Sequence, residues 1–147
     1  YGIESVSDEV LKINNKMVKV DDIYTATRNA KEVGLKIRLF FMIGLPGQDK
    51  NESENIIKFI KEIEPEGVDL STLVPFPGCD IYANPSKYNI KILNKDFSSY
   101  VSTLGLYGDE AEKDFIYEHD VLSNEELKKE RLKILEYIKA YDLSLNK

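Results

Sequence analysis

Apolar residues along this chain form short continuous runs that alternate with stretches in which they recur every three to four positions. The longest run extends from Leu35 to Ile43, where alternation gives way to Phe40-Phe41-Met42-Ile43. A run that is apolar on both faces is typical of a parallel strand covered by helices. The stretch from Val68 to Val74 predicts a second strand, and Tyr1–Glu4 fits the end of another.

Helix signals stand between and after these strands. Ser5 and Ser7 are candidate N-caps of a short helix, and Asp21 or Asp22 is expected to open a second one that ends at Gly34. A third helix is expected after Asn51, which has Glu54 three residues on, the spacing of a capping box. The first helix is expected to carry Val6, Val10, Leu11 and Ile13, and the second to place Ile23, Ala26, Ala30 and Val33 on one face. The third is expected to bury Ile56, Ile57, Phe59, Ile60 and Ile63.

Regular alternation stops after Tyr82. Order returns at Ser123-Asn124-Glu125-Glu126, a capping box flanked by Leu122 and Leu127 at the positions of a hydrophobic staple. An amphipathic helix of about five turns is expected from there, by the helical repeat. Strand, helix, strand, helix, strand with short connections predicts an α/β fold with parallel strands. The expected organisation is a barrel-like unit over residues 1–92 and a loop-rich segment with a helix over 93–147.

Composition narrows the class of protein. The 147 residues are 42% hydrophobic and 31% charged, as in an ordinary globular protein. A net charge of −6 argues against a nucleic-acid partner, and no apolar run approaches the roughly 20 residues of a membrane span. Cys79 is the only cysteine, which excludes an internal disulfide and a multi-cysteine metal site. With no signal-peptide pattern at its start, the chain is expected to be cytoplasmic.

Two segments at predicted strand ends carry candidate chemistry. Gly44-Leu45-Pro46-Gly47 follows the longest strand, where glycine could bring backbone amides close to a ligand; the alternative is a plain tight connection. Gly2-Ile3-Glu4-Ser5 offers a carboxylate and a hydroxyl suited to sugar hydroxyls; the alternative is a helix cap beside a solvated acid. Lys16 could meet a carboxylate or simply be solvated.

Three further features have simpler interpretations. Pro75-Phe76-Pro77-Gly78 could line a pocket but is more often a stiff turn. His119, the only histidine, is expected at the surface because no nucleophile or metal ligand accompanies it in the sequence. Cys79 is expected to be a small buried residue at a turn rather than a reactive thiol.

The joint order of these segments is more specific than any one of them. Gly2-Ile3-Glu4-Ser5, then 10–16, then 40–48, then 74–82 resembles the C-terminal half of the radical S-adenosylmethionine superfamily core. The resemblance covers Gly2 to about Ile92, and it is closest to the branch in which a cobalamin-binding domain precedes the radical domain. It implies half of a partial (β/α)6 TIM-like barrel with a helical C-terminal extension, whose three strands are the fourth, fifth and sixth of the family.

The resemblance also implies roles for single residues. Strand ends in the family surround S-adenosylmethionine, with an acid at its hydroxyls, a cation at its carboxylate and apolar groups on its purine. The implied cofactor-binding residues are Glu4 and Ser5 at the ribose, Lys16 at the methionine carboxylate, Met42, Ile43 and Gly44 at the adenine, and Val74 and Pro75 completing the adenine pocket. Asp80 and Tyr82 are further candidates for substrate contacts.

Two departures from the family pattern matter. The Cys-x3-Cys-x2-Cys loop that holds the family's 4Fe–4S cluster is absent. The chain is therefore expected to be an inactive fragment of an iron–sulfur oxidoreductase that cleaves S-adenosylmethionine and acts on an organic substrate, with cobalamin as a candidate second cofactor of the parent. Phe40 stands where some relatives carry a polar residue, so ribose contacts from that strand are not implied.

Alternatives and partners complete the expectations. Half a barrel has two open sheet edges, so we expect pairing with the missing N-terminal half, a homodimer, or cover from the segment Asp96 to Leu122. One rival hypothesis is a fragment of another TIM-barrel enzyme, a hydrolase or an aldolase, which requires a carboxylate pair or a Schiff-base lysine at the strand ends. The other is a non-catalytic interaction module built on a decayed barrel.

Overall fold

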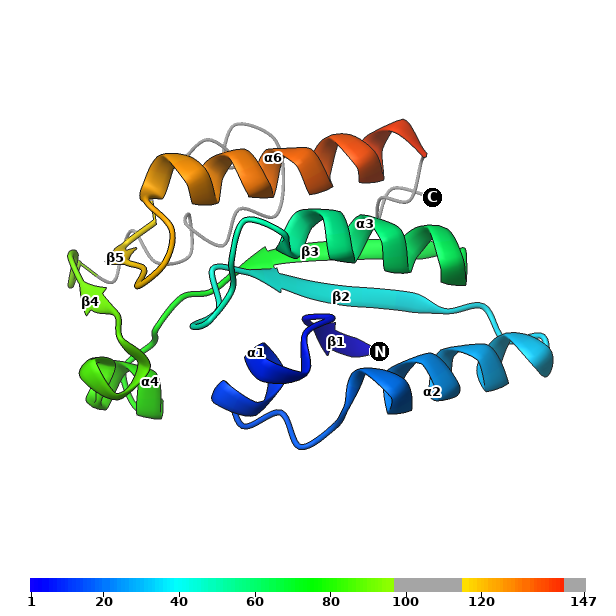
Figure 1. Cartoon of the computed structure of the whole chain (residues 1–147), viewed down its shortest axis with the longest axis horizontal. Coiled ribbons are helices and arrows are strands. Elements are labelled where there is room, and N and C mark those ends of the chain that lie inside the picture. The colour runs from blue at the N-terminus through cyan, green and yellow to red at the C-terminus, as the bar shows by residue number, and fades with distance from the viewer. Residues whose placement is uncertain (97–114, 142–147) are drawn as a thin grey trace.

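The computed structural model describes residues 1–96 and 115–141, and its centre is a three-stranded parallel sheet in the order β1-β2-β3 (Figure 1). The strands are β1 (Gly2–Glu4), β2 (Arg38–Ile43) and β3 (Gly67–Thr72). Helices α1 (Asp8–Ile13) and α2 (Val20–Glu32) join β1 to β2, and α3 (Glu52–Ile63) joins β2 to β3. This alternation confirms the predicted α/β half barrel with parallel strands.

The chain after β3 contributes smaller elements and one long helix. They are α4 (Asp80–Ala83), the 3-10 helix η1 (Pro85–Tyr88), the antiparallel pair β4 (Lys91–Ile92) and β5 (Tyr117–Glu118), and α6 (Asn124–Ala140). Figure 1 shows α6 lying alongside α3, and these two helices contact each other. The predicted division of the chain at residue 92 remains a prediction.

The sheet has one covered face and one open face. In β2, Leu39, Phe41 and Ile43 are fully buried against the helices. Phe40, which points to the other face, is 46% exposed, and Arg38 beside it pairs with Asp69 of β3 at 3.4 Å. The expectation of burial on both faces is therefore wrong for Phe40, because none of the described helices covers that face.

The helix layer packs through both apolar and polar contacts. Phe59 of α3 meets the Phe41 ring edge-on at 6.2 Å between centroids. Arg131 of α6 is fully buried and donates to Thr72 Oγ1 at 3.2 Å. The hydroxyl of Ser53 donates to the buried carboxylate of Glu130, which joins α3 to α6. Here α6 depends on polar contacts as well as on its apolar stripe.

The caps of the helices agree with the sequence in part. Ser7 caps α1 by accepting from Val10 N, and Ser123 caps α6 in a capping box with Glu126. Helix α2 begins at Val20, ahead of the predicted Asp21 or Asp22, because Asp22 Oδ2 accepts from Lys19 N from inside the first turn.

Other details of the helices differ from prediction. In α2, Thr27 is buried where Ala26 was expected to be, and Val33 is 74% exposed. Asn51 precedes α3 without a capping bond from its side chain, because that side chain instead donates to Asp49 Oδ2. The helical period predicted the buried face of α3, where Ile56, Phe59, Ile60 and Ile63 are buried, but in α2 only Ile23 and Ala30 of the predicted set are buried.

The outer strands β1 and β3 each pair with β2 alone within the described sheet. This matches the expected open edges. The segment expected to cover an edge falls largely on residues 97–114, outside the described residues, so cover and dimerisation both remain predictions. Among the helices of the described ranges, none combines the length and apolarity needed to cross a bilayer.

Candidate functional site at the strand ends

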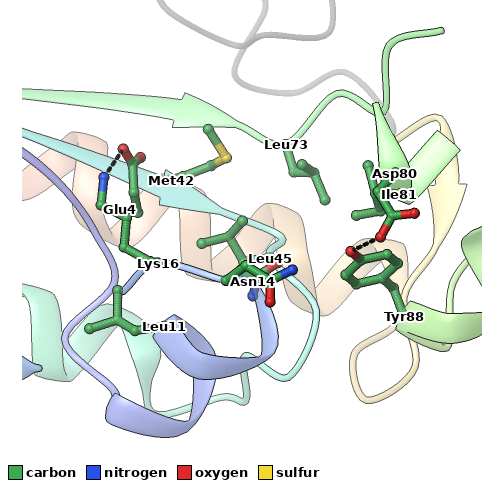
Figure 2. A pocket seen from close by; sticks show the side chains of 11 residues that line it. Glu4, Leu11, Asn14, Lys16, Met42, Leu45, Leu73, Asp80, Ile81 and Tyr88 are labelled. Atoms are coloured by element: carbon green, nitrogen blue, oxygen red, sulfur yellow. Dashed lines mark hydrogen bonds and ion pairs between the residues drawn. The ribbon is translucent and has the colours of Figure 1, made fainter. Parts of the chain in front are cut away.

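A pocket of about 370 Å³ lies where the carboxyl ends of the three strands meet α1 and α4. That volume is within the range of small-ligand sites. Figure 2 shows side chains from distant parts of the chain around it. Its lining residues are Glu4, Leu11, Asn14, Asn15, Lys16, Met42, Leu45, Leu73, Asp80, Ile81 and Tyr88.

One end of the pocket is formed by an ion pair. Lys16 Nζ lies 3.2 Å from Glu4 Oε1, and both side chains are about one-third exposed. Glu4 has a left-handed backbone (φ 67°), and the register of β1 on β2 shifts at this residue. Such irregularities re-aim a side chain at the end of a strand. The absence of a Cβ at Gly2 matters too, because an added Cβ would lie 2.9 Å from Glu4 Oε1.

Lys16 is held in place by the end of α1. Lys16 N donates to Leu11 O at 2.8 Å, and Asn15 N donates to Lys12 O at 3.2 Å. With Asn15 left-handed (φ 54°), this is the Schellman arrangement that ends a helix. The motif fixes the backbone of Lys16 directly opposite the end of β1, so the ammonium group can reach Glu4.

The middle of the pocket is apolar. Met42, at the end of β2, and Leu45, in the turn that follows it, form one wall (Figure 2). Leu11 of α1 and Leu73, just after β3, supply further apolar surface. Such a surface suits a flat apolar group such as an aromatic ring.

The other end carries a hydrogen-bonded carboxylate. Asp80 Oδ2 accepts from Tyr88 Oη at 2.6 Å and pairs with Lys87 Nζ at 2.5 Å. Asn84 donates to Asp80 Oδ1 at 2.7 Å. The hydrogen bond from Lys87 is the main reason that the pKa of Asp80 lies well below its usual value, with Tyr88 and Asn84 adding to it. Asp80 therefore remains ionised and acts as an acceptor.

The glycine turn after β2 offers a ligand no free amides at Gly44 and Leu45. The fully buried Gln48 accepts from Gly44 N at 2.7 Å and from Leu45 N at 3.0 Å. Its Nε2 donates to Met42 O at 2.9 Å. Of the two interpretations of this turn, the structure favours the plain tight connection, and Leu45 faces the pocket with its side chain.

The structure brings only some of the predicted site residues to the pocket. Glu4, Lys16 and Met42 line it together. Ser5 is fully buried and donates its hydroxyl to Glu52 Oε1 at 2.6 Å, so this hydroxyl is turned away from the pocket. The remaining predicted residues (Ile43, Gly44, Val74 and Pro75) are buried beside the pocket but do not line it.

Sequence reasoning missed several lining residues. Asn14 joins α1 to the turn by donating to Pro46 O at 3.0 Å, and Tyr88 comes from a short helix with little signal in the sequence. The sequence did contain a signal for the end of α1. Apart from glycine, asparagine is the residue that most readily takes the left-handed C′ position, and Asn15 takes it here. Nothing in the local pattern placed Leu45 or Tyr88 at the pocket.

The prediction of a surface position for His119 is wrong. The residue is 8% exposed, and its ring lies between the glycine turn and the start of α6. Cys79 lies at a turn as expected, and its thiol donates to Phe76 O at 2.8 Å, but the residue is half-buried rather than buried.

The pocket can therefore bind a ligand through one carboxylate–ammonium pair, an apolar wall and one acidic end. In the part of the chain that the structure describes, no group of His, Cys, Asp and Glu is arranged to hold a metal ion. The arrangement is that of a binding site for an organic molecule with hydroxyl or charged groups.

Comparison with known proteins gives three consistent findings. Residues 1–60 match the family model described as the Radical SAM superfamily. The chain is 28% identical over 102 residues, 69% of its length, to an uncharacterized methyltransferase of Pyrococcus horikoshii. It is 31% identical over 78 residues, 52% of its length, to the ribosomal protein uS12 methylthiotransferase RimO of Leptospira biflexa.

A solved structure resembles the whole described fold. The archaeal Elp3 of Methanocaldococcus infernus, lacking its residues 1–46, matches with a TM-score of 0.57 and 19% identity. The match covers 97% of this chain and 35% of that one. The chain spans 22% and 17% of the two curated relatives, so it corresponds to a part of each.

Proposed function

We propose that the chain, whose residues 1–60 match the Radical SAM superfamily model, is the C-terminal half of the barrel of a radical S-adenosylmethionine enzyme. In this proposal its pocket binds the adenosyl part of S-adenosylmethionine. The contribution of this half is to bind and orient the cofactor, and the 147 residues alone are inactive.

The observation that carries the proposal is the Glu4–Lys16 pair beside the wall of Met42 and Leu45. A carboxylate accepts hydrogen bonds from ribose hydroxyls, and an ammonium group pairs with the carboxylate of methionine. The apolar wall suits the face of a purine. Ser5, Ile43, Gly44, Val74 and Pro75 then act behind this surface by supporting the strand ends.

The residues of this chain do not fit an iron–sulfur cluster. Cysteine ligation of such a cluster takes several thiolates, and Cys79 is the only cysteine in the sequence. In radical S-adenosylmethionine enzymes this cluster supplies the electron for cleaving the cofactor, so that step belongs to residues outside this chain. We propose that the missing half of the barrel holds the cluster and pairs with the open sheet edges.

The reaction of the parent is proposed to be group transfer to an organic substrate. Similarity to a methyltransferase and to a methylthiotransferase supports this class. The order of the four sequence segments further supports the branch with an upstream cobalamin-binding domain. The parent gene is then expected to encode Cys-x3-Cys-x2-Cys about 100 residues upstream, the length of three βα units.

Nuclear magnetic resonance titration of the 147-residue chain tests the pocket. The ligands are 5′-methylthioadenosine, which lacks the amino acid part, and S-adenosylhomocysteine, which carries it. We expect both to shift the resonances of Met42 and Leu45. Glu4→Gln should weaken the binding of both ligands. Lys16→Gln should weaken the binding of S-adenosylhomocysteine about fivefold more than that of methylthioadenosine, which is the value of one partly exposed ion pair.

Lys58→Gln is the matched control. Lys58 also pairs with a glutamate, Glu62, at 4.0 Å, but it lies on α3 away from the pocket. We expect this variant to bind both ligands like the unchanged chain. Millimolar ligand that leaves the pocket resonances unmoved would overturn the proposal, as would equal losses in Lys16→Gln and Lys58→Gln.

A further inference from the structure

The carbonyl groups of the glycine turn are held by a segment that follows it by more than 70 residues. Tyr117 Oη donates to Gly44 O at 2.5 Å. His119 Nε2 lies 2.9 Å from Leu45 O. Both side chains come from β5 and the residue after it, beyond the part of the chain that carries the resemblance to the barrel.

These contacts complete the hydrogen bonding of the turn. Gln48 already accepts from the amides of Gly44 and Leu45, and Gln48 N donates to Leu45 O at 3.1 Å. The N–H and C=O groups of Gly44 and Leu45 are therefore all bonded within the protein. Because both the N–H and the C=O groups of the turn are hydrogen-bonded, its backbone has little freedom to move, and the side chain of Leu45 is held in the wall of the pocket.

The ring of His119 has a defined role for each nitrogen. Nδ1 lies 3.1 Å from Val121 N and 3.2 Å from Leu122 N, so it accepts from two amides. Leu45 O can only accept, so Nε2 carries a hydrogen and donates it to this carbonyl. One imidazole thus joins the start of α6 to the glycine turn. Asp120 Oδ1 also lies 3.2 Å from Nδ1.

The packing around Tyr117 fixes its hydroxyl in the same way. Tyr117 is fully buried, and burial raises its pKa far above the usual value, so the hydroxyl remains protonated and donates. Phe115 meets its ring edge-on at 5.9 Å. A methyl group added to Gly44 would overlap the Tyr117 hydroxyl, so glycine is required for this close approach.

We propose that Tyr117 and His119 are positioning residues that hold the Gly44–Leu45 turn, and with it the Leu45 wall, in the shape that accepts the adenosyl group. The inference rests on the proposed function for the identity of the ligand. The inference adds that the segment Tyr117–His119, which follows the barrel in the sequence, helps to shape the cofactor site.

Two variants separate this role from general stability. His119→Asn keeps an acceptor near the amides of Val121 and Leu122, as in an Asx turn, but it is too short to reach Leu45 O. Tyr117→Phe removes only the bond to Gly44 O. Lys91→Gln is the control, because Lys91 on β4 pairs with the exposed Glu118 on β5.

Amide hydrogen exchange of the 147-residue chain is the primary measurement. His119→Asn and Tyr117→Phe should each speed exchange at Gly44 and Leu45 about fivefold, the value of one net hydrogen bond of about 1 kcal/mol. Exchange at Ile60 in α3 should change less than twofold. The affinity for 5′-methylthioadenosine should fall by a similar factor, while Lys91→Gln alters neither.

Unchanged exchange at the turn, or an equal rise at the turn and at Ile60, would overturn the inference. Faster exchange confined to the turn with unchanged methylthioadenosine affinity would overturn it too, since the turn would then not govern the pocket. If the unchanged chain binds no methylthioadenosine, the proposed adenosyl function is wrong. Faster amide exchange confined to Gly44 and Leu45 in the two variants would then still show that Tyr117 and His119 hold the turn.

Discussion

Two glycine-containing turns follow neighbouring strands of this sheet, and they differ in the hydrogen bonds and packing around them. Gly44-Leu45-Pro46-Gly47 follows β2 and is bonded by Gln48, Tyr117 and His119. Pro75-Phe76-Pro77-Gly78 comes shortly after β3 and is closed by a bond from Cys79 N to Phe76 O at 3.2 Å. A Cβ on Gly44 would meet Tyr117 and Phe115, whereas a Cβ on Gly78 would have no atom of the described residues within 4 Å apart from its own chain neighbours.

The difference shows that a turn can require glycine for two separate reasons. Gly44 and Gly78 both have left-handed backbones, with φ of 86° and 95°. Gly78 needs glycine for its conformation alone, while Gly44 also needs it so that another segment can approach. Only the first requirement is visible in a local sequence pattern, because the second depends on residues more than 70 positions away.

The largest expected effect comes from Gly44→Ala. The methyl group adds both left-handed strain and overlap with Tyr117, so we expect a loss of about 3 kcal/mol in the free energy of unfolding. Gly78→Ala adds the strain alone and should cost about 1 kcal/mol. Chemical denaturation of both variants measures the difference, and equal losses would contradict the distinction between the turns.

Gln48→Ala should have the next largest effect. The change leaves the amides of Gly44 and Leu45 without their acceptor in a buried place, and we expect a loss of about 2 kcal/mol. Denaturation measures this loss, and hydrogen exchange should report faster exchange at the same two amides. A loss below that of Gly78→Ala would show that water replaces the glutamine and that the turn is less enclosed than the structure indicates.

The smallest expected effect is a dependence on pH at the start of α3. Glu52 is 2% exposed, and burial raises the pKa of its carboxyl above the usual value despite the hydrogen bond from Ser5. The folded chain therefore binds more protons than the unfolded chain, so stability falls as pH rises from the unfolded pKa through the folded one.

Glu52→Gln tests this by removing the titration while keeping an acceptor for Ser5. The stability of the unchanged chain relative to Glu52→Gln should fall as the pH rises above about 4, the ordinary glutamate pKa. Urea denaturation at several pH values gives the comparison. Parallel pH profiles would show that Glu52 keeps its ordinary pKa in the folded chain.

Much of the fold followed from local patterns. The capping box at Ser123 and Glu126, the glycine after α2 and the alternation of strands with helices all rest on contacts within a few residues, and each was found. Glu4 and Lys16 were also assigned to the site, and the structure pairs them. The surface position expected for His119 was wrong. Its ring bonds to the neighbouring Val121 and Leu122 and also to Leu45, which is 74 residues away in the sequence.

The sequence by itself determined the parallel α/β half barrel, the ends of most helices and the presence of an acid, a cation and an apolar residue at strand ends. Periodicity and capping set these features over short distances along the chain. Only the tertiary structure decided that Ser5 turns to Glu52, that Leu45 lines the pocket and that Tyr117 and His119 hold the glycine turn. Such contacts join residues 47 to 74 positions apart, and no local pattern specifies which distant donor will reach a given acceptor.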